Sequence, residues 1–161
     1  MLFYFAMSTG SGKSVAFDAD RLRSAGLRVT ASRLAVLAAV QAGDHLPVEE
    51  IALSARQRIG SISTQATYDA LAALVRVGLV RRIEPAGSPA RFETRVADNH
   101  HHVICRQCGV AVDVDCAALV APCLQPPDVN GFLIDEAEVV FWGTCSTCQE
   151  AADAGARSHW E

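Results

Sequence analysis

The chain is predicted to adopt an α+β fold, in which an N-terminal winged helix-turn-helix precedes a small C-terminal α/β domain. Two observations carry this prediction. Apolar residues recur at helical spacing through the first part of the chain, and two short alternating segments follow them. After Asp98 the pattern changes to strands, and cysteines appear in two C-x-x-C pairs. With 161 residues the chain has enough material for two small domains that depend on each other or on a second subunit.

The domain boundaries follow from changes in composition. We expect a flexible tail over 1–17, a winged helix over 18–97, a second domain over 98–150 and a frayed tail over 151–161. The apolar opening from Met1 to Met7 is short and lacks the basic flank of a signal peptide, and Met7 is an alternative start. No apolar run approaches the ~20 residues that span a bilayer. Paired cysteines without a signal peptide favour a reduced, cytoplasmic protein.

Helices are expected to fill most of the first domain. The first runs from Asp18 to Ala25, the second begins after Thr30 or Ser32, the third begins at Pro47 and the fourth begins after Ser63. Serine, threonine and proline are common at helix starts because they satisfy or do without the unpaired N–H groups there. Each helix is followed by a glycine that ends it: Gly26, Gly43, Gly60 and Gly78.

Strands are expected after these helices. Residues 79–83 and 91–95 alternate between apolar and polar side chains and predict the hairpin that forms the wing. In the second domain, strands flank the first cysteine pair. Residues 132–135 and 138–142 predict another hairpin, which leads into Cys145.

The charge is distributed unequally between the two halves. Residues 1–97 carry 12 Lys and Arg against 8 Asp and Glu, whereas residues 98–161 carry 2 against 10. A basic half suits a polyanion such as DNA, and an acidic half suits cations or a partner subunit. An ordinary solvated surface is the alternative for either half.

The two C-x-x-C pairs, Cys105 with Cys108 and Cys145 with Cys148, offer four thiolates for a tetrahedral zinc ion. Closed coordination by four sulfur atoms leaves no position for a substrate, so we expect a structural role and no enzymatic activity. A dithiol redox pair and iron–sulfur ligation are the alternatives.

Three consecutive histidines precede the first cysteine pair. In a strand, His100 and His102 share one face while His101 points to the other. Two imidazoles with added oxygen ligands suit Fe(II), Mn(II) or Zn(II) in a site that is less closed than the thiolate site. Three further residues are candidate ligands for the same ion: His45, Glu93 and Asp113.

The fourth helix has the features of a recognition helix, whose N-terminal residues meet base edges and phosphates in the major groove. Gln65 suits adenine, Ser63 and Tyr68 suit phosphates, and wing arginines suit the flanking backbone. A solvated capping segment with scattered arginines is the plain alternative. The candidate DNA contacts are Arg33, Ser63, Gln65, Thr67, Tyr68, Arg81, Arg82 and Arg91.

Together these residues resemble the ferric uptake regulator family of metal-dependent repressors. The matching segments are Leu27-Arg28-Val29-Thr30-x-x-Arg33, Ser63 to Val80, Arg91-Phe92-Glu93, Asn99 to Gly109 and Cys145-x-x-Cys148. The resemblance covers about residues 18–150. The segments around Asp98, Cys116, Cys123 and Glu136 are most similar to the actinobacterial branch that represses a catalase-peroxidase operon.

The resemblance implies a cytoplasmic homodimer that binds an AT-rich inverted repeat and represses oxidative-defence or iron genes. It implies that the four cysteines hold structural zinc. It also implies that a regulatory metal, Fe(II) with Mn(II) or Zn(II) as alternatives, joins the DNA-binding and dimerisation domains. The ligands implied for that metal are His45, Glu93, His100, His102 and Asp113.

The chain departs from the family pattern in three places. A third site in some relatives uses a histidine on the last hairpin, where this chain offers only Glu136 or Glu138 to join His101. Relatives that sense peroxide by histidine oxidation carry Asp where this chain has Glu93, which argues against that mechanism. Cys116 and Cys123 lie outside the zinc set, as buried thiols or as a redox pair.

Three rival functions remain open at this point. A zinc-uptake repressor of the same family has the same ligand types. A thiol-disulfide redox protein accounts for the C-x-x-C pairs but leaves the basic helical half without a role. A metal-storage module predicts no affinity for DNA.

Overall fold

The computed structural model describes residues 11–43, 45–96, 98, 100–116, 129–134 and 137–157. It divides the chain into two compact units. The first comprises the chain up to Glu84 together with Pro89–Val96, and the second comprises Pro85–Ser88 together with residues 97–161. In the part of the chain that the structure describes, no helix combines the length and apolarity needed to cross a membrane.

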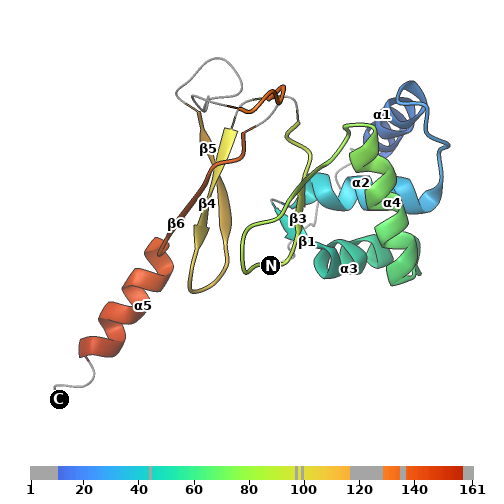
Figure 1. The fold of residues 1–161 in the computed structure, drawn as a ribbon. Helices are drawn as coiled ribbons and strands as arrows, with labels where there is room; N and C mark the ends of the chain where they lie inside the picture. The colour runs from blue at the N-terminus through green and yellow to red at the C-terminus, as the bar shows by residue number, and fades with distance from the viewer. Residues whose placement is uncertain are drawn as a thin grey trace, which may run out of the picture. The chain divides into compact units, whose positions relative to one another are not determined.

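Helices make up most of the first unit (Figure 1). They are α1 (Ser11–Ser24), α2 (Ala31–Ala42), α3 (Val48–Ile59) and α4 (Thr64–Arg76). Two of the predicted caps are confirmed, because Thr30 Oγ1 accepts the N–H of Arg33 at 3.2 Å and Ser63 Oγ accepts the N–H of Ala66 at 3.0 Å. Each of these bonds satisfies a donor that the first helical turn leaves open.

The core of the first unit lies where α2 packs against α3 and α4. The spacing of the apolar residues on these helices places one face of each inward. The buried side chains are Ala35, Val36, Leu37, Ala39 and Val40 of α2, Val48, Ile51, Ala52 and Ala55 of α3, and Ala70, Leu71, Ala73 and Leu74 of α4. The opposite face of α4 is therefore left exposed.

A three-stranded antiparallel sheet completes the first unit, in the order β1-β3-β2. The predicted wing is confirmed as β2 (Arg81–Ile83) and β3 (Arg91–Glu93), with Arg82 opposite Phe92. The sequence did not predict β1 (Leu46–Pro47), which pairs with β3 and places Leu46 opposite Phe92. Two residues, one of them proline, carry no alternating pattern from which a strand can be predicted.

The second unit contains a sheet of β4 (His100–Cys105), β5 (Ala111–Asp115) and β6 (Val140–Gly143), in the order β5-β4-β6 (Figure 1). β5 pairs antiparallel with β4, and β6 pairs parallel with it. The predicted hairpin of 132–135 with 138–142 is wrong, because residues 132–134 form no strand and β6 pairs with β4 instead. Alternation along a segment identifies a strand but does not identify its partner.

Two predicted tails are also wrong over part of their length. Helix α1 begins at Ser11, within the segment 1–17, and α5 (Ser146–Arg157) continues past residue 150. The segment after Gln149 is rich in alanine, which has the highest helix propensity, so the helix that starts after Cys145 continues through it.

Truncation of a buried leucine in the core of the first unit tests this packing. Leu37→Ala should lower the free energy of unfolding by about 2–5 kcal/mol, because the side chain is fully buried and its removal leaves a cavity. Leu53→Ala is the matched control, since Leu53 on α3 is 56% exposed and should cost little. Urea unfolding followed by far-UV circular dichroism measures both, and equal losses would contradict the assignment of the core.

Candidate metal centres and DNA-binding surface

The four cysteines of the two C-x-x-C pairs gather at one point of the second unit. Their Sγ atoms all lie within 4.8 Å of one another, and those of Cys108 and Cys145 are 3.7 Å apart. All four thiols are free. A tetrahedron with zinc–sulfur bonds of about 2.3 Å has sulfur–sulfur edges of about 3.8 Å. The cluster therefore has the dimensions of a tetrahedral thiolate metal site.

The parallel pairing of β4 with β6 brings the two cysteine pairs together. Cys105, the last residue of β4, is opposite Gly143, the last residue of β6. The N–H of Arg106 continues the pairing to the carbonyl of Gly143 at 2.8 Å, and the N–H of Cys145 points at Cys105 Sγ at 3.4 Å. Because both strands run in the same direction, both C-x-x-C segments leave the sheet at the same edge.

Hydrogen bonds from backbone N–H groups and neighbouring thiols give the cysteines of the cluster different pKa values. The N–H of Cys108, and then that of Cys145, stabilise the thiolate of Cys105 and lower its pKa to about 6. Side-chain hydrogen bonds with Cys145 and Cys108 raise the pKa of Cys148 to about 12. A metal that binds all four sulfurs must displace the protons that remain, so binding is favoured as the pH rises.

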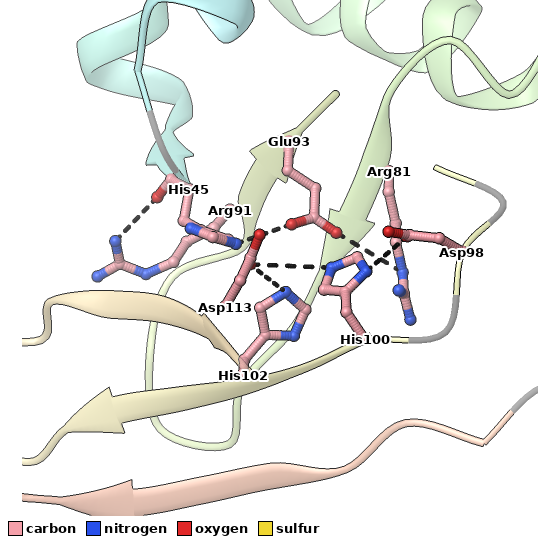
Figure 2. Close-up of polar contacts among 8 residues, drawn as sticks. All are labelled: His45, Arg81, Arg91, Glu93, Asp98, His100, His102 and Asp113. Carbon is pink, nitrogen blue, oxygen red and sulfur yellow. Dashed lines mark hydrogen bonds and ion pairs between the residues drawn. The ribbon is translucent and has the colours of Figure 1, made fainter. Parts of the chain in front are cut away.

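A second group of candidate ligands lies on the neighbouring strands β4 and β5. His102 is opposite Asp113 in the register, and its Nε2 lies 3.6 Å from Asp113 Oδ1 (Figure 2). His100 Nε2 lies 3.9 Å from the same oxygen. The two imidazole rings are 4.9 Å apart, and both side chains are buried. This confirms that His100 and His102 share a face, while His101 lies against the ring of Phe141 at 6.3 Å.

Asp98 is a member of this group that the sequence did not identify. Its Oδ1 lies 2.7 Å from Nδ1 of His100 (Figure 2). A carboxylate at that distance accepts the Nδ1 proton, which leaves Nε2 with the lone pair that a metal requires. An acidic residue two positions before a candidate ligand was the only signal in the sequence.

The third group lies in the first unit, where β1 meets β3. Leu46 is opposite Phe92, so the next pair along the two strands is His45 with Glu93. His45 Nε2 lies 2.7 Å from Glu93 Oε2, and Arg81 Nε lies 3.9 Å from Glu93 Oε1 (Figure 2). Both members of the His45–Glu93 pair are buried. The backbone of β1 thus explains how a loop histidine reaches a wing carboxylate.

His45 adopts a backbone conformation that residues other than glycine seldom adopt. Its φ is +56°, in the left-handed region, and its carbonyl accepts a hydrogen bond from Arg91 Nη1 at 2.9 Å. Residues other than glycine occupy this region at a cost, and such residues are concentrated at functional sites.

Each histidine–carboxylate group offers too few ligands to complete the coordination of a divalent transition metal. The first unit offers His45 and Glu93, and the second offers His100, His102 and Asp113. Such metals take four to six ligands in mixed nitrogen and oxygen sites. Neither group fills that number by itself.

The remaining candidate metal and redox residues receive less support. Glu136 and Cys123 lie outside the described residues. Glu138 is exposed and His101 is buried, and within the described residues neither belongs to a cluster of ligand atoms. Cys116 is half-buried, follows β5 directly and forms no disulfide bond with a described cysteine.

The exposed face of α4 carries part of the predicted DNA-binding set. Ser63, Gln65 and Tyr68 are all exposed there. Thr67 is a correction, because its side chain is fully buried on the core side of α4 and its hydroxyl donates to the carbonyl of Ser63 at 3.1 Å. A side chain that is buried against the core in this way cannot reach a base.

The candidate arginines differ in how they are held. Arg82 is exposed and pairs with Glu84 at 2.5 Å, whereas Arg33 donates to the carbonyl of Arg28 at 2.7 Å. Arg81 and Arg91 are partly buried beside the His45–Glu93 pair, with the contacts given above. Arg82 is therefore the wing arginine that is most available to a phosphate.

The chain was compared with known proteins and structures. The model of the ferric uptake regulator family matches residues 24–141. The transcriptional regulator FurA of Mycobacterium tuberculosis is 56% identical over 130 residues, which cover 81% of this chain and 88% of that protein. The peroxide-responsive repressor PerR of Staphylococcus aureus is 28% identical over 130 residues, 80% of this chain and 87% of PerR.

Two solved structures show the same fold at low sequence identity. The ferric uptake regulator of Helicobacter pylori, described as having three functional metal-binding sites, gives a TM-score of 0.61 at 21% identity and covers 85% of this chain and 93% of its own. A zinc uptake regulator in complex with zinc and DNA gives a TM-score of 0.62 at 19% identity and covers 91% and 99%.

The cysteine cluster generates a prediction about metal content. Cys145→Ser should lose the bound metal and unfold the second unit, because a serine hydroxyl replaces one of four thiolates and three hold the ion poorly. Cys116→Ser is the matched control, since that thiol lies outside the cluster. Zinc per chain and near-ultraviolet circular dichroism provide the measurement. A zinc-replete, folded Cys145→Ser protein would show that the cluster has no structural role.

Proposed function

Because the chain belongs to the ferric uptake regulator family and is a metal-dependent, DNA-binding transcriptional repressor, we propose that Fe(II) is its corepressor and that it acts as a cytoplasmic homodimer. Its targets are oxidative-stress genes, a catalase-peroxidase operon among them, and genes of iron homeostasis. The 56% identity to FurA supports the branch, and the similarity to a peroxide-responsive repressor supports the oxidative-stress link.

Zinc is the proposed occupant of the cysteine cluster, where it acts as a structural ion. The separation of 3.7 Å between Cys108 Sγ and Cys145 Sγ fits an edge of a zinc–thiolate tetrahedron and is far longer than a disulfide bond. Bound zinc contributes on the order of 10 kcal/mol to the folding of small domains of this kind. This argues against the thiol-disulfide function, which needs accessible thiols that exchange.

The regulatory metal is proposed to take its ligands from both units. His45 and Glu93 would supply the first part of the coordination, and His100, His102 and Asp113 the second. The observation that carries this proposal is that strand pairing brings a histidine to a carboxylate in each unit: His45 to Glu93, and His102 to Asp113. When bound, the metal supplies a positive charge that offsets the negative charges of Glu93 and Asp113.

Such a shared metal would link DNA affinity to metal concentration. His45, which precedes β1, and Glu93 of β3 belong to the domain that carries α4, and the ligands on β4 and β5 belong to the second domain. An ion that binds both sets favours the arrangement in which they meet. If that arrangement also presents the two recognition helices of a dimer at the spacing of an inverted repeat, metal and DNA stabilise the same state.

The second unit is the proposed dimerisation domain. Val112 and Val114 of β5 and Phe141 of β6 are exposed by 53, 37 and 49%. β5 is also an edge strand of its sheet. An edge strand and an apolar surface of this kind are normally covered, and a second copy of the chain is the proposed partner.

The DNA-binding surface is proposed to be the exposed face of α4 with the wing. This domain carries the positive charge of the chain, which suits phosphates. Ser63, Gln65 and Tyr68 face solvent at or near the start of α4, the part of a recognition helix that meets bases. An AT-rich inverted repeat is the proposed operator.

A titration of DNA binding with Fe(II), Mn(II) and Zn(II), under anaerobic conditions and at fixed salt, tests this function. The full chain, stripped of exchangeable metal but retaining zinc, should bind its own upstream region tightly with Fe(II). Tight binding with Zn(II) alone would instead support a zinc-uptake repressor. Binding that is independent of metal, or absent with every metal, would exclude a metal-dependent repressor.

His100→Ala should leave the zinc content and the dimer intact but lower metal-stimulated DNA affinity by about tenfold or more, because one of the proposed ligands is lost. His101→Ala is the matched control, since His101 lies on the opposite face of β4 against Phe141. Fluorescence anisotropy with labelled DNA measures both variants. Equal losses in the two would show that His100 is not a ligand.

Asp98→Asn should weaken binding of the exchangeable metal by about tenfold, because a neutral amide oxygen accepts the Nδ1 proton of His100 more weakly than a carboxylate does and raises the basicity of Nε2 less. Asp98→Glu keeps the carboxylate and should recover most of the affinity. Isothermal titration with Mn(II) reads the metal affinity without DNA. Unchanged affinity in Asp98→Asn would show that the contact has no positioning role.

A further inference from the structure

Asp69 is an acidic residue on the face of α4 that is proposed to meet DNA. It is exposed, and it is the only acidic residue in the helix. A carboxylate close to phosphates weakens binding to DNA, which carries a high negative charge. Asp69 lies beyond the first turn of α4, so the helix dipole does not explain its place either. The residue therefore needs another explanation.

The contact that Asp69 makes supplies one. Gln65 Nε2 donates to Asp69 Oδ1 at 2.8 Å, one helical turn away. An exposed pair at this spacing adds little to helix stability in water. The bond does, however, orient the amide. The reverse orientation would place the amide oxygen against a carboxylate oxygen, and two acceptors repel each other.

The orientation of this amide decides which base edge it matches. An adenine in the major groove offers an acceptor at N7 and a donor at N6, and an amide matches them with one N–H and its oxygen. The Gln65 amide has two N–H groups, and Asp69 uses one of them. The other N–H and Oε1 remain available as a donor–acceptor edge.

We propose that Asp69 is a positioning residue for sequence recognition, which holds the Gln65 amide in the orientation that reads adenine in the major groove. This inference rests on the proposed function, because it requires α4 to enter the groove of an operator. Asp69 contributes specificity at one base pair in each half-site and lowers affinity for DNA of any sequence.

Selection from a pool of randomised double-stranded DNA tests the proposal without knowledge of the operator. The full chain, loaded with Fe(II) under anaerobic conditions at fixed salt, is compared with Gln65→Ala, Asp69→Ala, Asp69→Asn and the double variant Gln65→Ala/Asp69→Ala. Glu50→Ala removes one exposed negative charge from α3 and controls for charge alone. Bound sequences give the base preference at each position.

Asp69→Ala should reduce the preference for adenine by about fivefold or more at the same position that Gln65→Ala relaxes, since a bidentate contact is lost there. Asp69→Asn retains an acceptor oxygen and should keep most of the preference. The double variant should match Gln65→Ala at that position. Glu50→Ala should leave every preference unchanged.

Three results would overturn the role of Asp69. The first is full retention of the adenine preference in Asp69→Ala, and the second is relaxation of a different position from the one that Gln65→Ala relaxes. The third is a loss of preference in Asp69→Asn as complete as that in Asp69→Ala. A wild-type chain that selects no sequence at all would instead refute the proposed repressor function, so the two failures are distinguishable.

Discussion

The parallel pairing of β4 with β6 is the constraint on which the second unit depends. It joins strands separated by 34 residues of sequence and brings their C-terminal ends to one edge of the sheet. Both C-x-x-C segments begin at that edge, so the four sulfurs meet without long loops. In an antiparallel arrangement the two pairs would lie at opposite ends of the strands. The direction of one strand thus determines whether the cluster exists.

Strand register has a similar effect on the histidines and carboxylates. In the second unit His102 and Asp113 lie directly opposite each other on neighbouring antiparallel strands, and in the first unit the pairing of β1 with β3 brings His45, the residue before β1, to Glu93 of β3. Cross-strand neighbours are among the closest side-chain pairs in a sheet. A shift of one residue in either register would turn one partner to the other face and separate the pair.

The recognition helix shows how one segment serves both folding and binding. Ala70, Leu71 and Leu74 pack into the core, and this anchors the face that carries Gln65 and Tyr68. Thr67 belongs to the core face although Tyr68 and Asp69, the next two residues, are exposed. The helical period of 3.6 residues separates them. A candidate contact near the start of a recognition helix must therefore be checked against the helix face on which it lies.

Local sequence patterns predicted much of this protein. Helical spacing and capping residues predicted α2, α3 and α4, and alternation predicted the wing and the strands around the first cysteine pair. The spacing of the cysteines predicted a tetrahedral thiolate site, since ligand chemistry is carried by residue type and local geometry. Alternation in His100 to His102 also predicted correctly which two rings share a face.

Long-range pairing was decided only by the tertiary structure. The partner of β6 and the short strand β1 both depend on which segments meet, and no local pattern encodes that choice. The sequence by itself determined which residues can bind metal and DNA, because their chemistry belongs to the side chains. The tertiary structure decided which of them lie together, because strand direction and register position side chains that are distant in sequence.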